Sequence, residues 1–163
     1  MAKFYFIRHA MTDANRSGSM VKNYDDTHIL PFDVEDWKKR IGKHINYDKM
    51  TDLIMTSPAA RCVETANCIF GNDSEIFYNA NLKEFDCEGL GDLKFWEIDE
   101  KTFNEKTGLT NADMDLQIDV LIDAFKEAER ICNCKKIICF SHGMVIRYIY
   151  HYFNNNKKIS PYD

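Results

Sequence analysis

Two histidines and two arginines of this chain could together do chemistry on an anion. They are Arg8 and His9 near the N-terminus, Arg61 in the first half of the chain and His142 towards its end. The planar guanidinium fork of arginine matches phosphate oxygens. A neutral histidine held among positive groups has a depressed pKa, keeps a lone pair at neutral pH and can attack phosphorus covalently. If the four side chains meet, they would bind a phosphoryl group and could transfer it.

Short apolar strands are the elements that would bring these side chains together. Apolar runs predict buried strands at Lys3 to Ile7, Leu53 to Thr56 and Lys136 to Phe140, with a further strand at Glu75 to Tyr78. Arg8-His9 and Ser141-His142-Gly143 directly follow two of them. In an open parallel sheet, ligands bind beyond the carboxyl ends of the strands. We therefore expect the four side chains to meet at one edge of the sheet.

Helices are predicted between these strands. The apolar spacing predicts helices over Val34 to Ile45, from Ser57 to about Ile69, over Asp113 to Cys132 and over Gly143 to Phe153. Ser57 is expected to cap the second of these, with Pro58 at its first position, while residues 11–33 and 79–92 are interpreted as loops. Strands that alternate with helices predict an α/β fold, a three-layer α/β/α sandwich with a mainly parallel sheet.

Composition restricts the class of protein. A chain of 163 residues fits one domain, and its net charge of −5 without any Lys/Arg run argues against nucleic-acid or anionic-membrane partners. The apolar run before Arg8 is too short for a signal peptide, so a cytoplasmic protein is expected. The six cysteines lie in or beside apolar stretches and are interpreted as reduced thiols.

Four segments of the chain resemble, in order, the signatures of the histidine phosphatase superfamily, whose fold is phosphoglycerate mutase-like. The resemblance extends over residues 3 to about 150. The segments are Arg8-His9-Ala10-Met11-Thr12 with Asn15, Thr56 to Ala66, Leu82 to Gly89, and Ser141-His142-Gly143 with Arg147.

The resemblance implies a role for several residues. It implies that His9 is the nucleophile, that Arg8, Arg61 and His142 bind the phosphoryl group, and that Glu84 protonates the leaving oxygen. Thr12 and Asn15 of the first segment are added as substrate-binding candidates. No metal ion and no cofactor are implied.

The sequence also departs from the family pattern. Ala10, Met11 and Cys87 stand where glycine, glutamate and glycine are usual. The chain ends soon after Asn156, where relatives add a strand, which leaves open a sheet without that edge strand. Asp86 and Glu88 are close to Glu84, and any of the three could be a solvated loop charge. Singly, His9 and His142 could each be a structural histidine, and Arg147 is interpreted as a structural partner in an ion pair.

The leading hypothesis is a phosphoric monoester hydrolase of the histidine acid phosphatase type, one domain over residues 1–163. Its partner would be a phosphorylated small molecule or a phosphoprotein, and no oligomeric state is predicted. The alternatives are a protein phosphohistidine phosphatase, a phosphoglycerate-type mutase and a catalytically inactive anion-binding module. Substrate choice is assigned to residues 13–33 and 90–110, where Phe95, Trp96 and Phe103 could line the site or belong to the core.

Overall fold

Four parallel strands form the sheet at the centre of the protein. A computed structural model describes residues 2–20, 27–91 and 93–154. In it the strands lie in the order β1-β4-β2-β3. They are β1 (Lys3–Arg8), β2 (Asp52–Thr56), β3 (Ile76–Tyr78) and β4 (Lys136–Ser141). The predicted α/β fold with a parallel sheet is confirmed, and residues 155–163, where the additional edge strand would lie, are outside the described residues.

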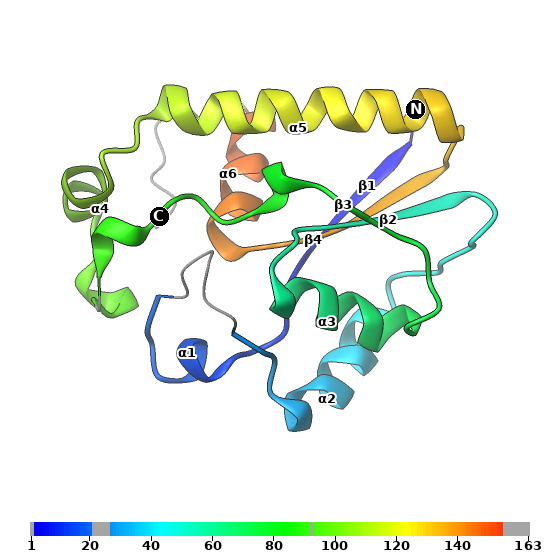
Figure 1. Cartoon of the computed structure of the whole chain (residues 1–163), viewed down its shortest axis with the longest axis horizontal. Helices are drawn as coiled ribbons and strands as arrows, with labels where there is room; N and C mark the ends of the chain where they lie inside the picture. Colours follow the sequence, from blue (N-terminus) through cyan, green and yellow to red (C-terminus); the bar gives the residue numbers. More distant parts are fainter. Residues whose placement is uncertain (1, 21–26, 92, 155–163) are drawn as a thin grey trace.

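Helices cover both faces of this sheet (Figure 1). The long helix α5 (Asn111–Cys132) and α6 (Gly143–Phe153) lie on one face, while α2 (Pro31–Gly42) and α3 (Ala60–Phe70) lie on the other. Side chains of a strand alternate between its two faces. In β4, Ile137 and Cys139 therefore join the apolar cluster under α5 and α6, and Ile138 and Phe140 join the cluster under α3. The three-layer arrangement follows from this alternation.

The segments between the main elements contain more regular structure than the sequence predicts. Residues 11–33 include the four-residue helix α1 (Asp13–Arg16) and the start of α2, and helix α4 (Glu100–Thr107) lies in a segment to which we assigned no element. Short 3-10 turns occupy Ala80–Leu82, Glu88–Leu90 and Phe95–Glu97. Thr12 and Asp99 cap α1 and α4 with side-chain oxygens, and Gly108 ends α4 in the left-handed conformation. These are local signals that a search for long apolar periods does not find.

The predicted cap of α3 is wrong. The helix begins at Ala60 after the N-cap residue Ala59, with no side-chain cap. Ser57 is fully buried, and its Oγ lies 2.9 Å from Nε2 of His142 while accepting a weaker hydrogen bond from the Ala59 amide at 3.3 Å. The hydroxyl is therefore turned towards the sheet edge, and Arg61 still lies in the first turn of the helix as expected.

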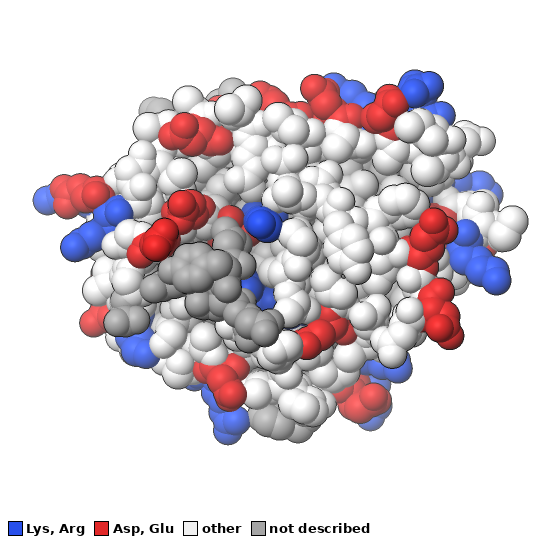
Figure 2. Space-filling view, in the orientation of Figure 1, with Lys and Arg blue, Asp and Glu red and all other residues white. Residues whose placement is uncertain are grey.

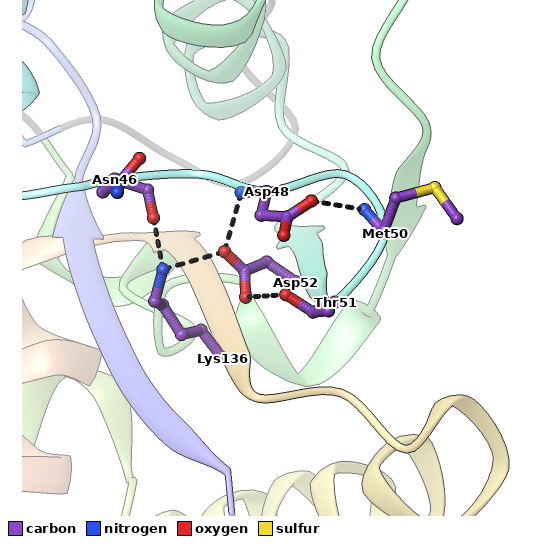
Figure 3. A network of polar contacts seen from close by, with 6 residues as sticks. All are labelled: Asn46, Asp48, Met50, Thr51, Asp52 and Lys136. Atoms are coloured by element: carbon purple, nitrogen blue, oxygen red, sulfur yellow. Dashed lines mark hydrogen bonds and ion pairs between the residues drawn. The ribbon is translucent and has the colours of Figure 1, made fainter.

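The amino ends of β2 and β4 are joined by an ion pair between a partly buried lysine and a buried aspartate (Figure 3). Asp52 and Lys136 are direct neighbours in the register, and Lys136 Nζ lies 2.9 Å from Asp52 Oδ2. Burial alone would raise the pKa of Asp52, but the Asp48 amide, Lys136 and Thr51 bind its carboxylate and lower the pKa overall. This end of the sheet is fixed by polar contacts, and the opposite end carries the residues singled out by the sequence.

Among the described residues, no helix combines the length and apolar character needed to cross a bilayer. The six cysteines are all unpaired thiols. On the face seen in Figure 2, acidic and basic side chains are mixed, with no broad area of one sign.

Candidate active site

A cavity of about 670 Å³ opens beyond the carboxyl ends of β1 and β4. It brings together six of the seven residues that the sequence singles out, namely Arg8, His9, Asn15, Arg61, Glu84 and His142. The remaining lining residues are Met20, Phe95, Gly143, Met144, Ile146, Arg147 and Tyr150. The cavity therefore lies where ligands bind in open parallel sheets.

His9 is held in one tautomer by the backbone. Its amide donates to Ser141 O at 3.0 Å, which fixes the residue directly after β1. The ring nitrogen Nδ1 lies 2.8 Å from Ala10 O, and since a carbonyl can only accept, Nδ1 carries the proton. Burial lowers the pKa of His9 to about 4, helped by the charges of Arg61 and Arg8 and opposed by the Ala10 hydrogen bond. At neutral pH the other ring nitrogen, Nε2, therefore keeps its lone pair.

His142 and Arg61 are bound to each other in the floor of the cavity. Arg61 Nη2 donates to His142 Nδ1 at 3.1 Å, and both side chains are almost fully buried. Burial, Arg61, His9 and Arg8 lower the pKa of His142 well below its ordinary value, so the ring is neutral. Its proton must then sit on Nε2 and be donated to Ser57 Oγ. The two histidine rings lie edge to face with centroids 5.4 Å apart.

Arg8 lies over the first turn of α6. A Cβ atom added to Gly143, the first residue of that helix, would lie 3.3 Å from Arg8 Nε. The missing side chain at this position allows the guanidinium to approach the helix N-terminus closely. Arg8 is exposed, unlike Arg61, and both line the cavity. Two guanidinium groups and a helix N-terminus at one point favour a bound anion.

Glu84 also binds the first turn of α6. Its carboxylate accepts hydrogen bonds from the amides of Phe85, Met144 and Val145 at 3.2 to 3.3 Å. Burial raises the pKa of Glu84 to about 7, although these three hydrogen bonds and Arg61 act in the opposite direction. A carboxyl group of this pKa holds a proton for part of the time at neutral pH and can act as a general acid.

The neighbouring acids of the Glu84 loop are placed differently. Asp86 and Glu88 are exposed, and Asp86 Oδ1 accepts a hydrogen bond from the Glu88 amide. Neither residue lines the cavity. Of the three acids, only Glu84 lies beside the two histidines.

Thr12 and Asn15 form a capping box at the start of α1. Thr12 is fully buried, and its Oγ1 accepts from the Asn15 amide at 3.2 Å and donates to Asn15 Oδ1 at 3.0 Å. Asn15 lines the cavity and Thr12 does not. Thr12 therefore orients Asn15 instead of reaching the cavity itself.

A comparison with models of known protein families identifies the superfamily of this chain. The model of the histidine phosphatase superfamily (branch 1) matches residues 4–160. The chain belongs to this superfamily. A sequence search of curated proteins finds no significant match.

Solved structures share the histidine phosphatase fold. Phosphoserine phosphatase from Entamoeba histolytica, solved in complex with 3-phosphoglyceric acid, superposes with a TM-score of 0.73 at 24% identity, covering 99% of this chain and 83% of that one. Phosphoglycerate mutase from Bacillus anthracis gives 0.68 at 14% identity, covering 98% and 83%. Mycobacterial glucosyl-3-phosphoglycerate phosphatase gives 0.68 at 16%, covering 93% and 81%. At these identities the likeness establishes the phosphoglycerate mutase-like fold.

Sequence reasoning missed several residues of this histidine phosphatase site. The sequence predicts a helix cap at Ser57, yet Ser57 contacts His142; Arg147, interpreted as a structural partner in an ion pair, also lines the cavity. Of the three aromatic candidates, Phe95 lines the cavity, Phe103 belongs to the core and Trp96 is 74% exposed. The sequence gives two signals for Arg147: it belongs to the fourth segment of the family resemblance, and it lies four residues after Gly143, which puts both on one helix face.

Proposed function

We propose that residues 1–163 form a single histidine phosphatase domain that hydrolyses phosphomonoesters through a phosphohistidine on His9. The observation that carries the proposal is the hydrogen bond between His9 Nδ1 and Ala10 O, because it leaves the lone pair on Nε2. The depressed pKa of this histidine, about 4, keeps the lone pair available at neutral pH. The family membership supports the same chemistry.

The reaction takes place in two steps. In the first, the lone pair of His9 Nε2 forms a bond to phosphorus as the bond from phosphorus to the leaving oxygen breaks, and the Glu84 carboxyl gives its proton to that oxygen. In the second, water attacks the phosphorus, its proton passes to the Glu84 carboxylate, and the P–N bond breaks. Inorganic phosphate leaves, and neutral His9 and protonated Glu84 are restored.

The positive groups of the cavity bind the phosphoryl oxygens. We assign this role to Arg8 and Arg61, with His142 orienting Arg61 and Asn15 adding an amide donor, while Thr12 acts through Asn15. Stabilisation of the equatorial oxygens is the main source of catalysis in phosphoryl transfer. The proposal requires no metal ion, and it includes the cytoplasmic location that the sequence predicts.

The first test is hydrolysis of para-nitrophenyl phosphate by wild type and His9→Ala with a chelator present. We expect chelator-resistant turnover that is lost in His9→Ala. Rapid quenching of wild type should trap a phosphoenzyme that is labile in acid, as a phosphoramidate is, and stable in base. Turnover by His9→Ala equal to wild type, or turnover abolished by the chelator, would contradict the proposal.

Transfer to a second acceptor would indicate a mutase instead. Phosphoglycerate mutase is among the proteins of this fold, so phosphoryl exchange between glycerate phosphates is the matching assay. A mutase is expected to have a cluster of arginine and tyrosine after the Glu84 loop. In this chain, the basic residues of segment 90–106 are Lys94, Lys101 and Lys106, and the segment has no arginine or tyrosine. We therefore expect release of phosphate to water to exceed exchange.

A further inference from the structure

One face of α6 forms a wall that leads away from the phosphoryl-binding residues. Gly143, Ile146, Arg147 and Tyr150 all line the cavity, and their spacing of three, four and seven residues places them on the same side of the helix. Gly143 lies under Arg8 at the anion-binding end. With a rise of about 1.5 Å per residue, the wall extends roughly 10 Å from there to Tyr150.

Two loops bring further apolar side chains to the same cavity. Met20 and Phe95 line it, and their segments are tied together by the Phe95 amide, which donates to Gly18 O at 2.9 Å. Ser19 and Lys94 pair as an antiparallel bridge, with Lys94 Nζ donating to Ser19 Oγ at 2.6 Å. We call these paired segments, Ser17–Met20 and Lys94–Trp96, the loop clamp. It fixes the positions of Met20 and Phe95 relative to each other.

The lining beyond the phosphoryl-binding end is therefore mostly apolar. Met20, Phe95, Ile146 and Tyr150 provide it, together with the cation Arg147. A guanidinium stacks well on an aromatic face, so Arg147 is compatible with an aromatic ligand. A cavity of about 670 Å³ is in the range that encloses a ligand larger than a phosphorylated three-carbon acid.

We propose that the preferred substrates are phosphomonoesters with an aromatic leaving group, such as aryl and aralkyl phosphates, whose ring packs against Phe95, Ile146 and Tyr150. This inference rests on the proposed phosphatase function and names its substrate class. The leaving group lies along α6, away from Arg8 and His9. Small polar hydroxy-acid phosphates leave these apolar side chains uncovered and are poorer substrates.

The test compares two esters whose leaving alcohols differ in the ring but are both primary alcohols. We expect kcat/KM for 2-phenylethyl phosphate to exceed that for ethyl phosphate by about 10- to 100-fold, the range for burial of a phenyl group. Because both leaving groups are primary alcohols, a difference in kcat/KM reports binding of the ring and not the ease of breaking the ester bond. Para-nitrophenyl phosphate cannot make this distinction, because its leaving group departs more easily. A ratio near one would overturn the inference while leaving the phosphatase proposal intact.

Substitutions of the residues that line the cavity test where the aromatic ring of the substrate binds. Phe95→Ala and Tyr150→Ala should each lower the ratio by about three- to tenfold, with a much smaller change for ethyl phosphate. Phe153→Ala is the matched control, because Phe153 is an aromatic residue of α6 that is 61% exposed and does not line the cavity. An unchanged ratio in both wall variants would overturn the placement of the leaving group.

A binding experiment keeps the inference separate from the proposed function. The stable analogues 2-phenylethylphosphonate and ethylphosphonate are titrated into wild type by calorimetry. At least about tenfold tighter binding of the aromatic analogue supports the inference even if no phosphate ester is turned over. Equal binding overturns it, and absence of turnover with para-nitrophenyl phosphate overturns the proposed function alone.

Discussion

At the scale of single residues, the site depends on where two protons sit. The Ala10 carbonyl places the proton of His9 on Nδ1, and the Arg61 guanidinium leaves the proton of His142 on Nε2. The types of these residues were predictable, since arginine and histidine follow buried strands. Their tautomers were not, because they depend on Ala10 O and Ser57 Oγ, contacts that no periodicity predicts.

The carboxyl group of Glu84 should control the alkaline limb of the pH profile. Its raised pKa, about 7, means that the proposed proton donor is lost as the pH rises through that value, while protonation of His9 removes the proposed nucleophile below about pH 4. We expect kcat/KM for 2-phenylethyl phosphate to fall on both sides of this window. In Glu84→Gln it should drop by about 10²–10⁴-fold and lose the alkaline limb.

Para-nitrophenyl phosphate is the control for this variant. Its leaving group needs little protonation, so Glu84→Gln should lose much less activity with it than with the alkyl ester. Asp86→Asn, an exposed acid of the same loop, should resemble wild type with both substrates. Equal losses on the two substrates would contradict the role of Glu84 as acid.

Ser57 should act as a positioning residue for His142. Ser57→Ala removes the closer acceptor of the Nε2 proton and leaves only Cys62 Sγ at 3.5 Å, so the ring that contacts Arg61 is held less firmly. We expect kcat/KM to fall by about tenfold, the equivalent of one hydrogen bond, and inorganic phosphate to become a correspondingly weaker inhibitor, because Arg61 holds the phosphoryl oxygens less firmly. Ser74→Ala, which removes a hydroxyl contact with Phe70 O beyond α3, should change neither quantity. Unaltered phosphate inhibition in Ser57→Ala would rule out this role.

At the scale of elements, long periodic segments were predictable and short ones were not. The range of α6 was predicted as observed, and α5 begins two residues earlier than expected, because each has a sustained apolar stripe. Helix α1 has only four residues and depends on the box between Thr12 and Asn15. Such a short helix has no apolar period. The place of Asn15 in the cavity could therefore be inferred only from the family resemblance.

The loop clamp should fail if Gly18 gains a side chain. Gly18 has a φ of +76°, and a Cβ there would lie 2.3 Å from Cζ3 of Trp96. Gly18→Ala should therefore displace Trp96 and the adjacent Phe95, raising KM for 2-phenylethyl phosphate several-fold with little effect on ethyl phosphate. Gly42→Ala, with no atom near the new Cβ, is the control.

A double variant separates the ring contact from backbone strain. If the clash with Trp96 causes the effect, Gly18→Ala should do less harm in a Trp96→Ala background than in wild type. Strain at a positive φ would persist in both backgrounds. Identical effects in the two backgrounds would show that the ring contact does not matter.

At the scale of the whole molecule, one end of the sheet carries a stabilising ion pair and the other end carries the candidate active site. The amino ends of β2 and β4 carry the Asp52–Lys136 pair, and the carboxyl ends of β1 and β4 lead into His9 and His142. The chain is acidic overall, with a net charge of −5, yet the three arginines Arg8, Arg61 and Arg147 line one cavity. Local concentration of positive charge, and not the net charge, is therefore what would select an anionic ligand.

This division predicts that the ion pair can be altered without loss of the site. Lys136→Met leaves the buried Asp52 carboxylate with only its Asp48 and Thr51 contacts, and we expect a loss of about 2 kcal/mol in the free energy of unfolding. Activity of the folded protein at low temperature should be retained. Lys126→Met, at an exposed pair with Asp123, is the control and should unfold at nearly the same urea concentration as wild type.

The pH dependence of stability gives the sign of the Asp52 contribution. The pKa of Asp52 is lowered in the folded protein, so its contribution is present above the ordinary value of 3.8 and is lost as the pH falls through the folded value. Lys136→Met removes the positive charge that counteracts the effect of burial on Asp52, so the pKa of Asp52 in the folded protein should rise. The variant should then be closest to wild type in stability in acid and furthest from it near neutral pH.

Adding Asp52→Asn should restore much of the loss at neutral pH, because no buried charge remains. Urea unfolding of wild type, Lys136→Met and the double variant at several pH values measures this directly, and a stability difference independent of pH would show that the pair contributes through packing alone.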